Sequence, residues 1–181
     1  FAGKSAAMFM RSFTTFGLSP EAFDSLTGEA GGQRIEGCGP LAGLIAVEEC
    51  LDFTPHEGFR FGLLKPDRQA RLSRVLIQGR HYEVEASDSS TVLREEGTPI
   101  ISIGGVAVVR RFLYSEAEVS FDISALDSRR VLLRLLKKGK YQLLVDGRAV
   151  DVFSGNSRKF TVPEGEHVVL VQLLEDLEKD R

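Results

Sequence analysis

The chain has no tryptophan and only two cysteines among its 181 residues. Cys38 and Cys50 are too few for the disulfide framework of a small secreted domain, and they either pair with each other or remain reduced, buried thiols. The net charge is only −3, so the basic excess typical of nucleic-acid-binding proteins is missing. No apolar run reaches the roughly 20 residues that a membrane-spanning helix needs. We therefore expect neither a nucleic acid nor a membrane as partner.

Residues that carry metal or acyl-transfer chemistry are scattered. None of the three histidines, His56, His81 and His167, has a second histidine or a cysteine at a metal-ligand spacing. A Gly-x-Ser-x-Gly nucleophile elbow is also absent from the sequence. We therefore expect no metal site and no cofactor.

The first 54 residues carry helix signals. Apolar residues recur at spacings of three and four between Ala6 and Phe16, which predicts one apolar helix face. Ser19-Pro20-Glu21 predicts a second, short helix, because serine caps a helix, proline fits its first turn and an acid suits its positive end. A glycine-rich loop follows from Gly28 to Gly39. Pro40 then opens a third predicted helix, which runs to about Leu51.

Residues 56–173 show short apolar runs separated by turn residues, which is the pattern of β-strands. Val119, Phe121 and Ile123, for example, alternate with polar residues. Asp146-Gly147 is the strongest hairpin signal in the chain, and further turns are predicted at Gln78-Gly79 and Lys138-Gly139. Strands at this spacing predict an antiparallel sandwich or barrel, of which we favour the sandwich.

These patterns predict an α+β fold, in which N-terminal helices precede an antiparallel β-sandwich. We place the helical segment at residues 1–54, the β-sandwich domain at 55–175 and a charged tail at 176–181. Three helices cannot bury their apolar faces alone. We therefore expect a homodimer through the N-terminal helices, or exposed apolar surface there.

One stretch of the sequence carries a more specific pattern. Glu21-Ala22-Phe23-Asp24 places two acids around an aromatic residue, a glycine-rich loop follows, and Gly37-Cys38-Gly39-Pro40 precedes the third predicted helix. This order resembles the last hairpin of the (α/α)₆-toroid glycoside hydrolases, the group that includes trehalases and processing α-glucosidases. That family has tryptophan where this chain has Pro40. The resemblance covers about residues 5–55, and members of the group can continue into a C-terminal β-domain.

The resemblance implies a carbohydrate ligand and a role for several acids. Glu21 aligns with the carboxylate that acts as general base in inverting members, and Phe23, Asp24 and Glu36 become candidate substrate-binding residues. The family's general acid comes from a hairpin far upstream. We therefore expect the chain to be the C-terminal part of a glycosidase and to be inactive alone.

Two other functions remain open at this point. The chain is alternatively a non-catalytic carbohydrate-binding or scaffolding β-sandwich, a reading that the missing tryptophan weakens, since sugars often stack on that ring. A polysaccharide lyase tail ranks last, because such enzymes use a Tyr/His pair and residues 1–54 contain neither residue.

Overall fold

A computed structural model describes residues 22–23, 30–31, 51–62 and 70–176. The chain divides into two compact units, Phe1–Glu49 and Cys50–Arg181. In the first unit, strands β1 (Ala22–Phe23) and β2 (Ala30–Gly31) pair antiparallel, with Phe23 opposite Ala30.

The predicted α+β class is wrong, because the described residues contain no helix and the fold is all-β. Strand β1 lies inside the helix predicted from Ser19, and strand β3 begins at Leu51, where the third helix was expected to end. In β3, Leu51 is buried and Phe53 packs against the core, a period-2 pattern typical of a strand. The predicted helices at residues 6–16 and 40–50, and the apolar face expected to drive dimerisation, lie outside the described residues.

The second unit is an eleven-stranded antiparallel sheet. Its strands are β3 (Leu51–Thr54), β4 (Gly58–Gly62), β5 (Ala70–Ile77), β6 (Arg80–Ala86), β7 (Ser90–Glu95), β8 (Thr98–Gly104), β9 (Val108–Tyr114), β10 (Glu118–Ala125), β11 (Arg129–Val145), β12 (Arg148–Val162) and β13 (Gly165–Asp176). The predicted antiparallel β-structure after residue 55 is therefore confirmed.

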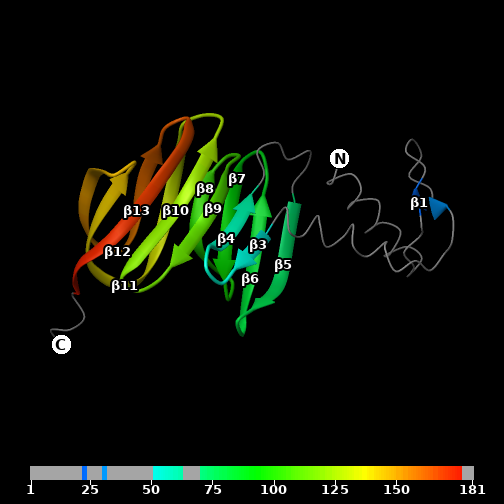
Figure 1. Ribbon diagram of the computed structural model, residues 1–181, viewed down its shortest axis with the longest axis horizontal. Coiled ribbons are helices and arrows are strands. Elements are labelled where there is room, and N and C mark those ends of the chain that lie inside the picture. Colours follow the sequence, from blue (N-terminus) through cyan, green and yellow to red (C-terminus); the bar gives the residue numbers. More distant parts are fainter. Residues whose placement is uncertain (1–21, 24–29, 32–50, 63–69, 177–181) are drawn as a thin grey trace. The chain divides into compact units, whose positions relative to one another are not determined.

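Strand β11 joins the two parts of this sheet (Figure 1). Its first part pairs with β8, its last part pairs with β13, and β12 follows it along both parts. Strands β5 to β8 form one side, which we call the meander half. Strands β3, β4, β9, β10 and β13 form the other, which we call the five-strand half.

The two halves share one hydrophobic core. Leu93 and Ile101 of the meander half belong to the same buried cluster as Phe112 and Phe121 of the five-strand half. The ring of Phe59 on β4 lies 4.7 Å from that of Tyr82 on β6, centroid to centroid. The sheet therefore folds over on itself like a sandwich, and the predicted inward alternation of β10 is confirmed.

The Asp146-Gly147 hairpin is confirmed, and both of its residues have positive φ, as a type I′ turn requires. The predicted turn at Lys138-Gly139 is wrong, because β11 runs straight through it. A Cβ on Gly139 would lie 2.4 Å from Leu173 Cδ1 and 2.9 Å from the Glu175 carbonyl oxygen. This glycine therefore permits close packing at the point where β11 changes neighbours, instead of reversing the chain.

Candidate functional site

Most of the site predicted from the sequence lies outside the described residues. This holds for Glu21, Asp24 and Glu36, so their roles as general base and substrate-binding residues stay predictions. Phe23 is described as a residue of β1, opposite Ala30 of β2. The structure thus tests none of these roles, and the chemistry that can be examined lies in the β-unit.

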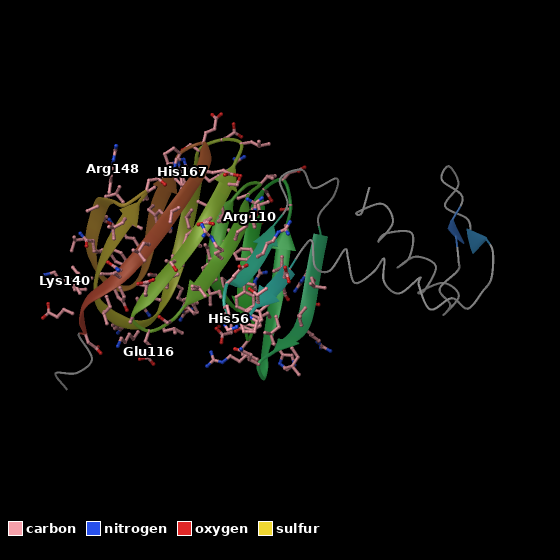
Figure 2. All side chains as sticks on the ribbon, in the orientation of Figure 1. His56, Arg110, Glu116, Lys140, Arg148 and His167 are labelled. Carbon is pink, nitrogen blue, oxygen red and sulfur yellow. The ribbon has the colours of Figure 1, made fainter. Side chains whose placement is uncertain are left out.

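A surface hollow of about 280 Å³ opens over β9, β10 and β13, and we call it the β9–β13 hollow. Most of its polar side chains alternate along the strands with residues of the core. Figure 2 labels two of them, Arg110 and His167, on strands either side of β10. The hollow is lined by Val108, Arg110, Arg111, Asp122, Ile123, Ser124, Glu166, His167 and Val168.

A β-bulge in β9 shapes one wall of the hollow. The register of β9 shifts against β4 at Arg110 and Arg111 and against β10 at Arg111 and Phe112, and Arg111 adopts a positive φ of 51°. An extra residue of this kind kinks a strand and re-aims its side chains. Both arginines are consequently exposed on the same stretch of β9.

The bulge also exchanges ion-pair partners. Asp122 is the cross-strand partner of Arg110, yet its Oδ2 accepts a 2.6 Å hydrogen bond from Nε of Arg111 and lies 2.5 Å from Nη2 of the same side chain. This hydrogen bond raises the pKa of Arg111 above its ordinary value. Arg110 is left with a loose contact, 3.7 Å from its Nη1 to Oε1 of Glu166.

His167 lies at the end of the hollow on the other face of the sheet, in register with the buried Ile123, and its ring is held from both sides. Its Nδ1 lies 2.7 Å from Asp146 Oδ2, and its Nε2 lies 3.1 Å from the carbonyl oxygen of Glu164. Both neighbours are acceptors, so the fully hydrogen-bonded ring is the imidazolium, which donates twice. The hydrogen bond to Asp146, followed by that to Glu164, raises the pKa of His167.

Asp146 connects this histidine to the hairpin turn between β11 and β12. Its Oδ1 accepts a 2.9 Å hydrogen bond from the Val168 amide, and its own amide donates to the Val168 carbonyl at 2.8 Å. The hydrogen bond from His167, and then that from Val168, lowers the pKa of Asp146. The two residues therefore pin the turn to the start of β13.

Sequence reasoning did not find this pair, since it considered His167 only as a possible metal ligand. Its side chain is only 17% exposed. The available signal was the hairpin at Asp146-Gly147 together with a histidine soon after the next turn. An antiparallel β13 beside β11 brings those two places together, but the sequence does not specify that neighbour.

The charges around the hollow balance. Arg110, Arg111 and His167 face three acids, namely Glu166, Asp122 and Asp146 respectively. The hollow therefore offers hydrogen-bond donors and acceptors without a strong net charge. In the imidazolium form, which the raised pKa favours, both ring nitrogens of His167 donate and no lone pair is left to act as a base.

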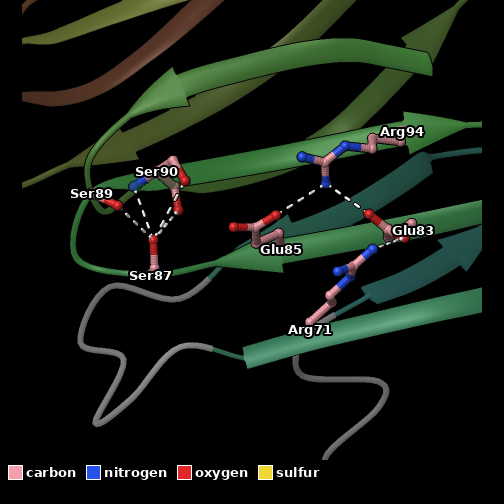
Figure 3. A network of polar contacts seen from close by, with 7 residues as sticks. All are labelled: Arg71, Glu83, Glu85, Ser87, Ser89, Ser90 and Arg94. Atoms are coloured by element: carbon pink, nitrogen blue, oxygen red, sulfur yellow. Dashed lines mark hydrogen bonds and ion pairs between the residues drawn. The ribbon is translucent and has the colours of Figure 1, made fainter. Parts of the chain in front are cut away.

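The meander half carries a contrasting polar network (Figure 3). Nη1 of Arg94 lies 2.8 Å from Glu83 and 3.2 Å from Glu85, and Nη2 of Arg71 lies 2.9 Å from Glu83. Glu83 is only 18% exposed. These arginines and acids already form direct ion pairs with one another, so fewer charged side chains of this network remain to bind a ligand.

The meander half also contains a buried acid at the end of β7. Glu95 is paired with Arg80 and is one of two buried polar residues among those described. Burial, reinforced by the charge of Glu95, raises the pKa of Tyr114 to about 12, and the Tyr114 hydroxyl donates to the Arg134 carbonyl. The Tyr114–Arg134 hydrogen bond is a structural contact between β9 of the five-strand half and β11.

Within the described ranges, no cluster of three or more His, Cys, Asp or Glu side chains is placed to hold a metal ion. The same part of the chain contains no helix that could cross a membrane. Comparisons with known protein families, curated proteins and solved structures yield no match to this chain.

Proposed function

We propose that the chain contributes to a glycoside hydrolase that acts on glycosidic bonds, with carbohydrate as its ligand. The observation that carries this proposal is the motif Glu21-Ala22-Phe23-Asp24, followed by the glycine-rich loop and Gly37-Cys38-Gly39. The antiparallel β-unit that begins at Cys50 comes after this motif, the order seen in the family that the motif resembles.

In this proposal Glu21 is the general base of an inverting reaction. It takes a proton from water, whose oxygen attacks the anomeric carbon while a second carboxyl group protonates the departing sugar oxygen. Phe23, Asp24 and Glu36 contact the sugar. In the family that the motif resembles, the acid precedes the matched segment, so the proposal assigns it to a part of the protein outside these 181 residues.

The test compares the complete gene product with variants at two acids. Glu21→Gln removes the base, and we expect kcat on α-linked disaccharides to fall by about 10²–10⁴-fold with little change in KM. Glu29→Gln, an acid of the neighbouring loop, is the matched control and should retain activity. Full activity in Glu21→Gln would contradict the proposal. Glycosidase activity in the 181-residue chain alone would contradict the assignment of the acid to another part of the protein, and its loss in Glu21→Gln would still support the role of Glu21.

A second function, non-catalytic carbohydrate binding by the β-unit, is favoured by the β9–β13 hollow. Its mixed donors and acceptors suit hydroxyl groups, and its balanced charge suits a neutral ligand. This function predicts sugar affinity that persists in Glu21→Ala. Loss of all sugar affinity in that variant would contradict it.

A further inference from the structure

We propose that the β9–β13 hollow binds a neutral saccharide, held between the side chains of Arg110 and Glu166. This inference rests on the proposed function, because it names the ligand class that the β-unit of a carbohydrate-active protein would recognise. Of the three ion pairs at or beside the hollow, two are short and one is long.

Two of these pairs are tight and fixed. Arg111 binds Asp122 through Nε at 2.6 Å, and His167 binds Asp146 at 2.7 Å while its other nitrogen bonds a carbonyl. Moving any of these side chains breaks a short, charged hydrogen bond, which belongs to the stronger kinds in proteins. The Arg111–Asp122 pair therefore acts as a preformed wall of the hollow, and the His167–Asp146 pair fixes the start of β13 beside it.

The third pair is open. Arg110 Nη1 and Glu166 Oε1 are 3.7 Å apart, which is too far for a hydrogen bond, and their side chains are 46% and 78% exposed. The bulge explains why Arg110 lacks a close acidic partner. Asp122 lies opposite Arg110, but its carboxylate is hydrogen-bonded to the inserted residue Arg111. One guanidinium and one carboxylate thus remain available at the rim.

A sugar hydroxyl pair matches this arrangement. Neighbouring hydroxyls accept from the guanidinium and donate to the carboxylate, so both halves of the open pair gain a hydrogen bond. Ser124, the cross-strand partner of Glu166, adds a hydroxyl at the hollow, and the exposed Val168 offers an apolar contact to sugar C–H groups.

The charges favour a neutral sugar over an anion. The groups that face Arg110, Arg111 and His167 are Asp122, Glu166 and Asp146, so each cation already has an acidic neighbour. An anionic ligand would have to displace Glu166 and would be repelled by Asp122. A neutral ligand bridges Arg110 and Glu166 without adding a charge, and it leaves the short Arg111–Asp122 pair in place.

The experiment titrates the complete 181-residue chain with trehalose and maltotriose as neutral probes, and with digalacturonate and inorganic phosphate as anions. Amide chemical shifts report where each probe binds. We expect saturable shifts from at least one neutral sugar at about 10 mM, concentrated at Ser124, Glu166 and Val168. Absence of saturable shifts, shifts confined to other strands, or binding of the anions alone would overturn the inference.

Two variants and a matched control identify the residues. Arg110→Ala and Glu166→Ala should each weaken sugar binding by about tenfold or more, with unchanged amide dispersion because both side chains are exposed. Arg130→Ala removes an exposed arginine of β11 that does not line the hollow, and it should bind like the parent chain. Equal loss in Arg130→Ala, or no loss in Arg110→Ala, would contradict the assignment.

The same titration on Glu21→Gln separates this inference from the proposed function. Sugar binding at the hollow should persist in that variant. If hydrolysis by the complete protein depends on Glu21 while the hollow binds nothing, only the inference fails. If the hollow binds and no hydrolysis is found, the glycosidase proposal fails and the binding site stands.

Discussion

The meander half and the five-strand half both carry arginines and acids on their solvent side, but they pair them differently. On the meander half, Glu83 and Arg94 are cross-strand partners and also ion-pair partners, 2.8 Å apart. On the five-strand half, Arg110 and Asp122 are cross-strand partners, yet Arg111 holds the carboxylate. The β6–β7 register is unshifted and lets cross-strand partners form the ion pair, whereas the residue inserted in β9 leaves Arg110 available to a ligand.

The largest expected effect comes from the core beneath the bulge. Phe112, fully buried, lies 5.8 Å from the Phe61 ring and 5.7 Å from the Phe121 ring. Phe112→Ala should lower the free energy of unfolding by about 3–5 kcal/mol, measured by denaturant titration. If the halves unfold as one cooperative unit, spectroscopic probes placed in each half should show the same lowered denaturant midpoint.

The neighbouring residue supplies the control for this test. Leu113→Ala truncates an exposed side chain, and it should change stability by less than about 1 kcal/mol. A shift seen only by probes of the five-strand half would show that the halves unfold separately.

The next effect tests the difference in charge pairing directly. Glu83→Gln removes the acid shared by Arg71 and Arg94, and should cost about 1 kcal/mol at low salt. Glu166→Gln, in the loose pair, should stay within about 0.5 kcal/mol. Denaturant midpoints at low and high salt measure both. Equal losses of stability in the two variants would show that the two halves do not differ in the strength of their ion pairs.

A smaller, pH-dependent effect should come from His167 and Asp146. The raised pKa of His167 adds stability that is complete below its ordinary value of about 6.5 and is lost as the pH rises through the folded value. The lowered pKa of Asp146 adds stability above about 3.9 that is lost as the pH falls through its folded value.

The stability difference between the parent chain and His167→Gln should consequently be greatest between about pH 4 and 6.5. Thermal unfolding across pH 3–9 measures it, with His81→Gln on the meander half run in parallel. A difference that is flat across this range would refute the role of the pair.

The smallest effect is a gain in stability on the meander half. Gln78 has a φ of 50° in the two-residue turn between β5 and β6, a conformation that asparagine adopts more readily than glutamine. Gln78→Asn should raise the free energy of unfolding by roughly 0.5 kcal/mol. Gln142→Asn within β11 should give no gain, and equal gains would point to a cause other than the turn.

Local sequence patterns predicted the strands well. Alternation along β10 and the turns at Gln78-Gly79 and Asp146-Gly147 follow from the residues themselves. The helix expected from Ser19-Pro20-Glu21 failed at Ala22 and Phe23, because capping residues favour a helix without supplying one. Lys138-Gly139 resembled a turn, but Gly139 is needed there for contact with Leu173.

The β9–β13 hollow was beyond prediction for a different reason. Arg110-Arg111 reads as an ordinary pair of surface residues, and only pairing with β4 and β10 reveals the inserted residue. Asp146 and His167 are 21 positions apart and meet because β13 lies beside β11. Non-local strand pairing decides both features. The proposed roles of Glu21, Phe23, Asp24 and Glu36 rest on the sequence alone.

The pairing of β4 with β9 has a consequence for how the chain reaches this fold. Gly62 and Val108 are cross-strand partners, so the chain leaves the five-strand half and returns to it at one point. The meander half is topologically an insertion within a β4–β9 hairpin. Its own strands connect through short turns and can form early, while β4 and β9 must close a long loop before they gain any contact. The pairing of β4 with the bulged strand β9 is therefore expected to form late during folding.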